Sequence, residues 1–150
     1  GDVFVEDNTW NILFAPDIIE LIPEAKFLHV YRNPMDTVAS LTHQRWCSSS
    51  KIEAAVWYRD IMDTWLSIRE DLPTDSYYEL KLEDLVESTE RVVQEICDFA
   101  GLDYDSQLID IDLGQSNAGR WKRDFSTEEQ TTVMSILDSI PERLGYGSDC

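Results

Sequence analysis

Residues 26–40 read KFLHVYRNPMDTVAS, and this stretch decides the predicted fold. Phe27–Tyr31 is a nearly continuous apolar run, which predicts a strand buried on both faces, as in a parallel sheet. Pro34 then suits the first turn of a helix, because the N–H group that proline lacks would have no intrahelical partner there. Arg32 stands between strand and helix, where its charge opposes the positive end of the helix dipole. We therefore expect an anion close to Arg32.

The rest of the chain predicts helices around one further strand. The aromatic, alternating stretch 76–82 is typical of that strand, and 51–72 repeats apolar residues at helical spacing. The other predicted helices are 16–23, 34–47, 88–101 with Gly101 at its end, and 126–140 with a Ser126–Glu129 capping box and a stop at Pro141. Expected core side chains include His29, Val38, Leu41, Trp46, Ile52, Met62 and Trp65. Strands alternating with helices imply an α/β fold, a small parallel sheet flanked by helices.

Composition limits the possible functions. At 150 residues, 43% of them hydrophobic, the chain is expected to form a single ordered domain over 1–150. Its 12 basic and 30 acidic residues give a net charge of −18, which argues against nucleic-acid binding because phosphate backbones would be repelled. No apolar run approaches the roughly 18 residues of a membrane span.

The cysteines and histidines predict no metal site. Three cysteines without CxxC spacing favour a reduced, cytoplasmic setting over a disulfide framework. His43 and Cys47 are spaced to share a helix face, but no third metal ligand stands near them in the sequence.

Arg32 and Ser40 are the candidate anion ligands. A strand that feeds a helix N-terminus at the carboxyl edge of a parallel sheet is a common phosphate site, since free N–H groups and the dipole favour anions. Arg32 adds a forked donor that matches phosphate geometry, and Ser40 lies about two turns on, on the same helix face. In the alternative, Arg32 pairs only with Asp36, and Ser40 faces solvent or the core.

The same stretch resembles the second nucleotide-binding segment of the sulfotransferase family, where a strand ends in Arg-[Asp/Asn]-Pro and a serine follows eight residues after the arginine. Three later stretches agree with the family in order: LKLEDLVESTERVVQEICDFAGLDYD at 80–105, GRWKRDFSTEEQ at 119–130 and PERLGY at 141–146. The resemblance implies a P-loop-type, three-layer α/β fold and 3′-phosphoadenosine 5′-phosphosulfate (PAPS) as co-substrate. It also implies that Arg32 and Ser40 hold the 3′-phosphate.

Residues 119–123, GRWKR, form the densest basic cluster of this acidic chain. The resemblance implies that Arg120, Trp121 and Lys122 lie near the 3′-phosphate end of the nucleotide. The alternative is that Trp121 fills the core while its basic neighbours are solvated.

Three departures from the family bear on activity. Family members open with a strand, a Gly/Ser/Thr-rich phosphate loop and a helix, whereas the six glycines here form no such cluster, so the resemblance implies the C-terminal portion of the family fold. Asp7 stands where the family often has a lysine, which leaves Glu6 or Asp7 as the candidate catalytic base, or both as a solvated acidic turn. Leu82 replaces a tyrosine that lies near the adenine in many members.

The predicted function is transfer of a sulfuryl group from PAPS to a hydroxyl or amine acceptor, whose identity depends on variable loops. The alternative is a non-catalytic nucleotide-binding or protein-interaction module on the same scaffold. A chain lacking the first strand and helix of the family would expose a sheet edge and apolar surface, so we also expect a homo-oligomer or strand-exchanged dimer.

Overall fold

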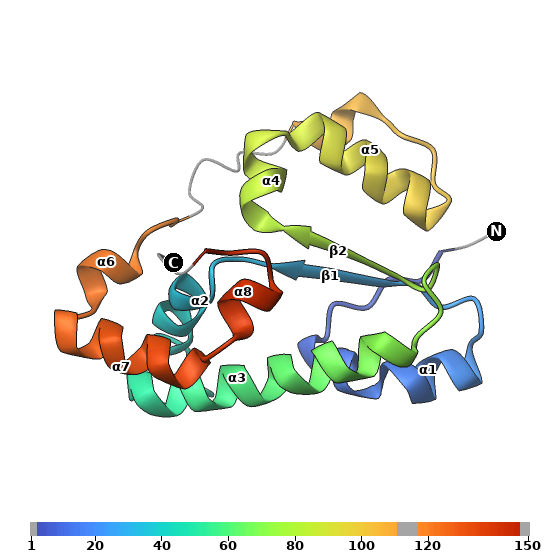
Figure 1. The fold of residues 1–150 in the computed structure, drawn as a ribbon. Helices are drawn as coiled ribbons and strands as arrows, with labels where there is room; N and C mark the ends of the chain where they lie inside the picture. The colour runs from blue at the N-terminus through green and yellow to red at the C-terminus, as the bar shows by residue number, and fades with distance from the viewer. Residues whose placement is uncertain (1–2, 111–116, 148–150) are drawn as a thin grey trace.

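The computed structural model describes residues 3–110 and 117–147, which fold into three layers (Figure 1). Along the chain the elements are η1 (Thr9–Phe14), α1 (Ala15–Leu21), β1 (Phe27–Tyr31), α2 (Pro34–Leu41), α3 (Lys51–Ile68), η2 (Arg69–Asp71), β2 (Tyr77–Lys81), α4 (Leu82–Glu87), α5 (Thr89–Ala100), η3 (Ser106–Ile109), α6 (Trp121–Asp124), α7 (Thr127–Leu137) and α8 (Ile140–Arg143). The strands form the middle layer, with α1 and α3 on one face and α4 and α5 on the other (Figure 1). The predicted α/β class is confirmed.

The two strands pair in parallel, with Phe27 opposite Tyr77 and Tyr31 opposite Lys81. Side chains alternate between the faces of a strand, and the odd-numbered residues of both strands face α3. Trp65 of α3 is fully buried against them, and its ring lies 5.2 Å from that of His29 and 5.9 Å from that of Tyr77. This contact anchors the longest helix to the sheet.

Local signals in the sequence set the ends of several helices. Ser50 caps α3 by accepting the N–H of Glu53 at 3.4 Å, and the predicted Ser126–Glu129 capping box opens α7. Gly101 ends α5 with φ of 71°, a left-handed conformation that glycine adopts without strain. In the described part of the chain, no helix is long and apolar enough to cross a membrane.

The prediction that β1 is buried on both faces is wrong. Leu28 and Val30 are 44% and 47% exposed. The layer of α4 and α5 covers β2 on that face, where Leu80 is buried and Tyr78 packs on Phe99 with ring centroids 5.6 Å apart. That layer does not extend over β1, so the apolar side chains on this face of β1 remain partly exposed.

Three other predictions are wrong in detail. The helix after Pro34 ends at Leu41, so Trp46 lies beyond it, 62% exposed and packed on the ring of Trp57 at 5.5 Å. Ile52 is exposed, because it falls outside the buried stripe of α3. The last long helix ends at Leu137 rather than at Pro141. Pro141 instead lies in the first turn of α8, a position that tolerates proline.

Candidate functional site

The carboxyl ends of both strands meet at one edge of the sheet, and α2 begins there after β1. Asn33 closes this turn: its Oδ1 accepts the backbone N–H groups of Met35 at 2.9 Å and Asp36 at 3.3 Å. Its carbonyl accepts the N–H of Thr37 at 3.0 Å, and Pro34 has no N–H to offer. The free helix N–H groups expected from the sequence are therefore already used, so side chains must hold any anion here.

The guanidinium group of Arg32 lies along α2. Its Nη2 donates to the backbone carbonyl of Asp36 at 3.0 Å. Ser40 is one helical turn beyond Asp36 and is partly buried. The structure thus brings the Arg32 side chain toward the turn that carries Ser40. Arg32 does pair with Asp36, as in the alternative, but with its backbone carbonyl rather than its carboxylate.

Asp36 has a different partner, which the sequence did not reveal. Its carboxylate accepts the backbone N–H of Gly119 at 2.7 Å through Oδ2 and that of Trp121 at 3.1 Å through Oδ1. The side chain is buried, at 2% exposed. Two charge-assisted hydrogen bonds to main-chain donors therefore fix the basic segment 119–123 against α2. The sequence offered one signal for this contact: Asp36 stands in the first turn of a helix whose apolar residues predict burial.

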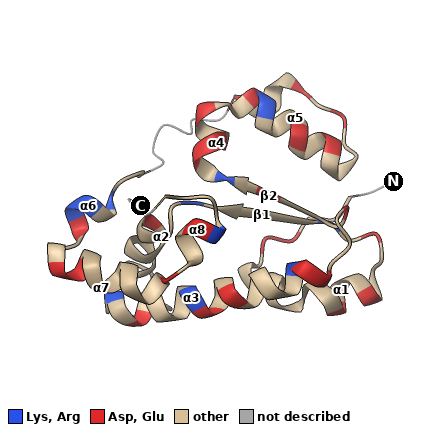
Figure 2. Cartoon of the chain, in the orientation of Figure 1, with Lys and Arg blue, Asp and Glu red and all other residues tan. Residues whose placement is uncertain are grey.

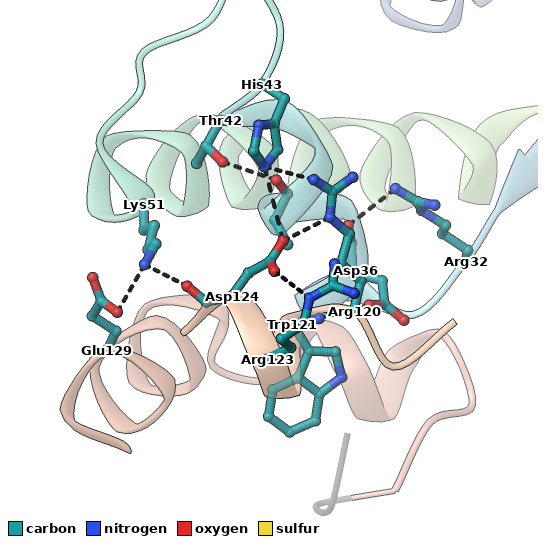
Figure 3. Close-up of polar contacts among 11 residues, drawn as sticks. Arg32, Asp36, Thr42, His43, Lys51, Arg120, Trp121, Arg123, Asp124 and Glu129 are labelled. Carbon is teal, nitrogen blue, oxygen red and sulfur yellow. Dashed lines mark hydrogen bonds and ion pairs between the residues drawn. The ribbon is translucent and has the colours of Figure 1, made fainter. Parts of the chain in front are cut away.

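Arg120 of this segment has two hydrogen-bond partners, Asp124 at the end of α6 and His43 after α2 (Figure 3). Its Nε donates to Oδ2 of Asp124 at 2.6 Å, and its Nη2 lies 2.8 Å from Nε2 of His43. A guanidinium group can only donate, so in this hydrogen bond Nε2 of His43 is the acceptor. The hydrogen bond from Arg120 outweighs desolvation and, together with one from Arg123, holds the pKa of Asp124 below its usual range. Among the described residues, Asp124 and His43 are the partners of the Arg120 guanidinium group, which leaves further N–H donors to offer a ligand.

Lys51 ties the start of α3 to the same region. Its Nζ donates to the carbonyl of Asp124 at 2.7 Å and to Oε2 of Glu129 at 2.8 Å. It also lies 4.9 Å from the centroid of the Phe125 ring. These contacts join the start of α3 to the end of α6 and to α7, and they use two of the three N–H donors of Lys51 (Figure 3).

Basic positions gather at α6, whereas most other charged positions along the chain are acidic (Figure 2). Lys122 is exposed, with its Nζ 5.3 Å from the ring centroid of Trp121. The Trp121 ring is 8% exposed and belongs to the hydrophobic core. The structure therefore shows Trp121 as a core residue that contacts the site through its backbone, and its role as a nucleotide ligand stays a prediction.

A cavity of about 230 Å³ adjoins Arg32 at the end of β1. Its walls include Val30, Tyr31, Thr37, Tyr58 and Leu82. A lining of aromatic and aliphatic side chains that also includes Arg32 suits a ligand with a flat apolar part and an anionic group.

Glu6 and Asp7 lie in a segment without regular secondary structure before η1, and both are exposed. Within the described residues, neither side chain forms an ion pair or a hydrogen bond with Arg32 or Arg120. Their role as a catalytic base stays a prediction.

Comparison with known proteins gives this site a context. Residues 1–106 match the model of the sulfotransferase family. A 3-beta-hydroxysteroid sulfotransferase of Cavia porcellus is 25% identical over 140 residues, an alignment that covers 82% of this chain and 46% of the relative.

Two solved structures share the fold. A sulfotransferase domain from the curacin biosynthetic pathway superposes with a TM-score of 0.67 at 15% identity, over 94% of this chain and 61% of that domain. A sulfotransferase domain from the Synechococcus PCC 7002 olefin synthase gives a TM-score of 0.68 at 23% identity, over 94% and 57%. The chain thus spans about half the length of the curated relative and about three fifths of these domains. On the match over residues 1–106, the chain belongs to the sulfotransferase family.

Proposed function

We propose that this chain binds PAPS and its product adenosine 3′,5′-bisphosphate, with Arg32 and Ser40 as ligands of the 3′-phosphate. The observation that carries the proposal is the position of Arg32, which α2 holds within one turn of Ser40 at the carboxyl edge of the sheet. Arg120 and Lys122 lie on the segment that Asp36 fastens to the same helix. In a chain of net charge −18, such a cluster is what a highly anionic nucleotide requires.

The occupied N–H groups of α2 make the side chains decisive. Many phosphate sites share the charge between backbone amides and a cation, but here Asn33 has taken the amides of Met35 and Asp36. Arg32 then supplies the principal donors, and its planar fork fits two phosphate oxygens at once. A lysine at this position would bring the charge but not the paired donors.

The reaction we propose is transfer of the sulfuryl group to a hydroxyl or amine acceptor. The acceptor oxygen or nitrogen forms the new bond to sulfur as the bond from sulfur to the phosphate oxygen of PAPS breaks. The acceptor proton passes to a base, for which Glu6 and Asp7 are the candidates. Positioned cations stabilise the charge that develops on the leaving phosphate.

Isothermal titration calorimetry with adenosine 3′,5′-bisphosphate tests the binding proposal. We expect Arg32→Ala to weaken binding about 10- to 100-fold, the range for loss of charge-assisted hydrogen bonds. Ser40→Ala, which removes one neutral partner, should weaken it about 5-fold. Arg91→Ala is the matched control, because Arg91 lies on α5 and pairs with Glu95 at 2.7 Å. Equal affinity of wild type and Arg32→Ala would remove Arg32 from the site.

A second candidate function is nucleotide binding without transfer. It is favoured by the exposure of Glu6 and Asp7 and by the acidic residue where the family often has a lysine. The two candidates separate when PAPS is supplied with a panel of phenols, alcohols and amines. Release of adenosine 3′,5′-bisphosphate that depends on the acceptor supports transfer, while tight binding without release supports the non-catalytic module.

A further inference from the structure

Glu83, in the first turn of α4, joins two segments that are distant in sequence. Its Oε1 accepts the backbone N–H of Asn33 at 2.9 Å, across 50 residues of chain. Its Oε2 accepts the hydroxyl of Tyr146 at 2.8 Å, across 63 residues. One carboxylate therefore links the turn that follows β1 to the C-terminal segment after α8.

Tyr146 is held from several sides, so it offers Glu83 a fixed donor. Its ring meets that of Tyr31 edge-on, with centroids 6.3 Å apart, and Nζ of Lys81 lies 4.4 Å from its centroid. The same Nζ donates to the carbonyl of Gly145 at 2.7 Å. Gly145 has φ of 74°, and a side-chain carbon there would lie 3.3 Å from the Lys81 amino group. The chain thus turns sharply before Tyr146 in a way that glycine permits.

The Tyr146 hydroxyl keeps its proton at all ordinary pH values. Burial in the first place, and then the hydrogen bond to Glu83, raises the pKa of Tyr146 far above its usual value. The hydroxyl therefore remains a donor to the carboxylate.

The link acts on the residue next to Arg32. Asn33 caps α2 through its side chain while Glu83 holds its backbone N–H, so the residue is fixed at both ends. Any shift of Asn33 moves the backbone of Arg32 and alters the path of its guanidinium group along α2. A displacement of about 1 Å is enough to impair a site of this kind.

We infer that Glu83 and Tyr146 are positioning residues of the Arg32–Ser40 phosphate site, holding the Arg32–Asn33 turn in its binding conformation from the C-terminal end of the chain. This inference rests on the proposed function. It gives a shared role to two stretches that the sequence left apart, LEDL at 82–85 and PERLGY at 141–146.

Four variants test the inference by titration with adenosine 3′,5′-bisphosphate. Glu83→Ala removes both contacts and should weaken binding about 5- to 10-fold, and Tyr146→Phe, which loses only the hydroxyl, about 2- to 4-fold. Glu83→Gln should stay within about 2-fold of wild type, because its amide can accept from Asn33 and donate to Tyr146. Glu87→Ala removes an exposed carboxylate from the same helix and should bind like wild type.

Amide exchange at Asn33, followed by NMR, provides a readout that needs no nucleotide. We expect at least 10-fold faster exchange in Glu83→Ala and no change in Glu83→Gln or Glu87→Ala, with circular dichroism showing that all four variants remain folded. Faster exchange at Asn33 with unchanged affinity overturns the inference, and so does an affinity loss in Glu83→Gln equal to that in Glu83→Ala. If wild type does not bind the nucleotide, the proposed function fails, and exchange alone then decides whether Glu83 holds the turn. Unchanged exchange at Asn33 in Glu83→Ala would show that Glu83 does not hold the turn, which also overturns the inference.

Discussion

At the scale of single residues, the carboxylate of Glu79 in β2 has three side-chain hydrogen-bond partners. It lies opposite His29 in the sheet and accepts the Nδ1 of that histidine at 2.9 Å through Oε1. The same oxygen accepts Nε1–H of Trp65 at 2.7 Å, while Arg69 donates to Oε2. Desolvation alone would raise the pKa of Glu79, but the hydrogen bonds from His29 and Trp65 and the charge of Arg69 outweigh it and lower the pKa. His29, expected in the core, has this hydrogen-bond partner but is only partly buried.

Glu79→Gln should lower the free energy of unfolding at pH 7 by about 2 kcal/mol, because charged acceptors contribute more than neutral ones and Arg69 would lose its partner. Urea denaturation followed by tryptophan fluorescence measures this. Glu70→Gln is the control, since Glu70 is exposed beside Arg69. A loss equal to that of the control would show that the Glu79 carboxylate carries no special weight.

The same residue predicts how stability depends on pH. A carboxyl group with a lowered pKa in the folded state stabilises the fold above its unfolded pKa of about 4.3, and that contribution disappears as pH falls through the folded value. The difference in unfolding free energy between wild type and Glu79→Gln should therefore be largest near pH 7 and shrink below about pH 4. Denaturation curves at pH 7, 5 and 3.5 would reveal this trend, and a difference that stays constant over the series would contradict it.

At the scale of elements, the critical contact is between α2 and the segment that enters α6. A single buried carboxylate, that of Asp36, makes it through the N–H groups of Gly119 and Trp121. Lys51 of α3 provides a second attachment, because its Nζ donates both to the carbonyl of Asp124 at the end of α6 and to the carboxylate of Glu129 in α7. Two kinds of contact therefore hold segment 119–123: the hydrogen bonds from its backbone to Asp36, and the packing of the Trp121 side chain in the hydrophobic core.

Asp36→Asn should destabilise the protein by about 2 kcal/mol, because an amide can accept only one of the two N–H groups and turns its own N–H toward the other. It should also weaken binding of adenosine 3′,5′-bisphosphate about 5-fold, as segment 119–123 loosens. Chemical denaturation and amide exchange at Gly119 and Trp121 report the two effects. Asp98→Asn, on the exposed side of α5, should alter neither. Unchanged exchange at Gly119 in Asp36→Asn would show that the segment is held by other contacts.

At the scale of the whole molecule, two features oppose each other. The two-stranded sheet leaves one edge of β1 unpaired by any described strand, and Leu28 and Val30 add exposed apolar surface beside it. The net charge of −18 repels other copies of the chain. Salt screens the repulsion but not the apolar contact.

Self-association should therefore increase with ionic strength. Multi-angle light scattering at low and at high salt would measure it, with dimers or larger species expected at high salt. Replacing Leu28 and Val30 together by threonine keeps the strand propensity of both positions and should restore the monomer. Ile52→Thr, a change of the same kind on exposed α3 surface, is the control. A stable monomer at every salt concentration would contradict the prediction.

The sequence by itself determined the elements and the family. The apolar run of β1, the proline that opens α2, the cap at Ser126 and the glycine after α5 are local signals that a few neighbouring residues specify, and the structure confirms each. The assignment of Arg32 and Ser40 as phosphate ligands is likewise a prediction from local spacing, since Arg32 ends the strand and Ser40 follows eight residues later.

Only the tertiary structure decided what those elements leave exposed and what they join. The bare face of β1 depends on where the layer of α4 and α5 ends, which no pattern within β1 can show. Asp36 finds Gly119 across 83 residues and Glu83 finds Tyr146 across 63, and such pairs arise from packing rather than from spacing. The capping of α2 by Asn33 is local, yet only the three-dimensional structure shows that Asn33 occupies the backbone N–H groups to which an anion would otherwise bind. The periodicity of a sequence indicates which face of an element a residue lies on, whereas the residue it contacts depends on which other element packs against that face.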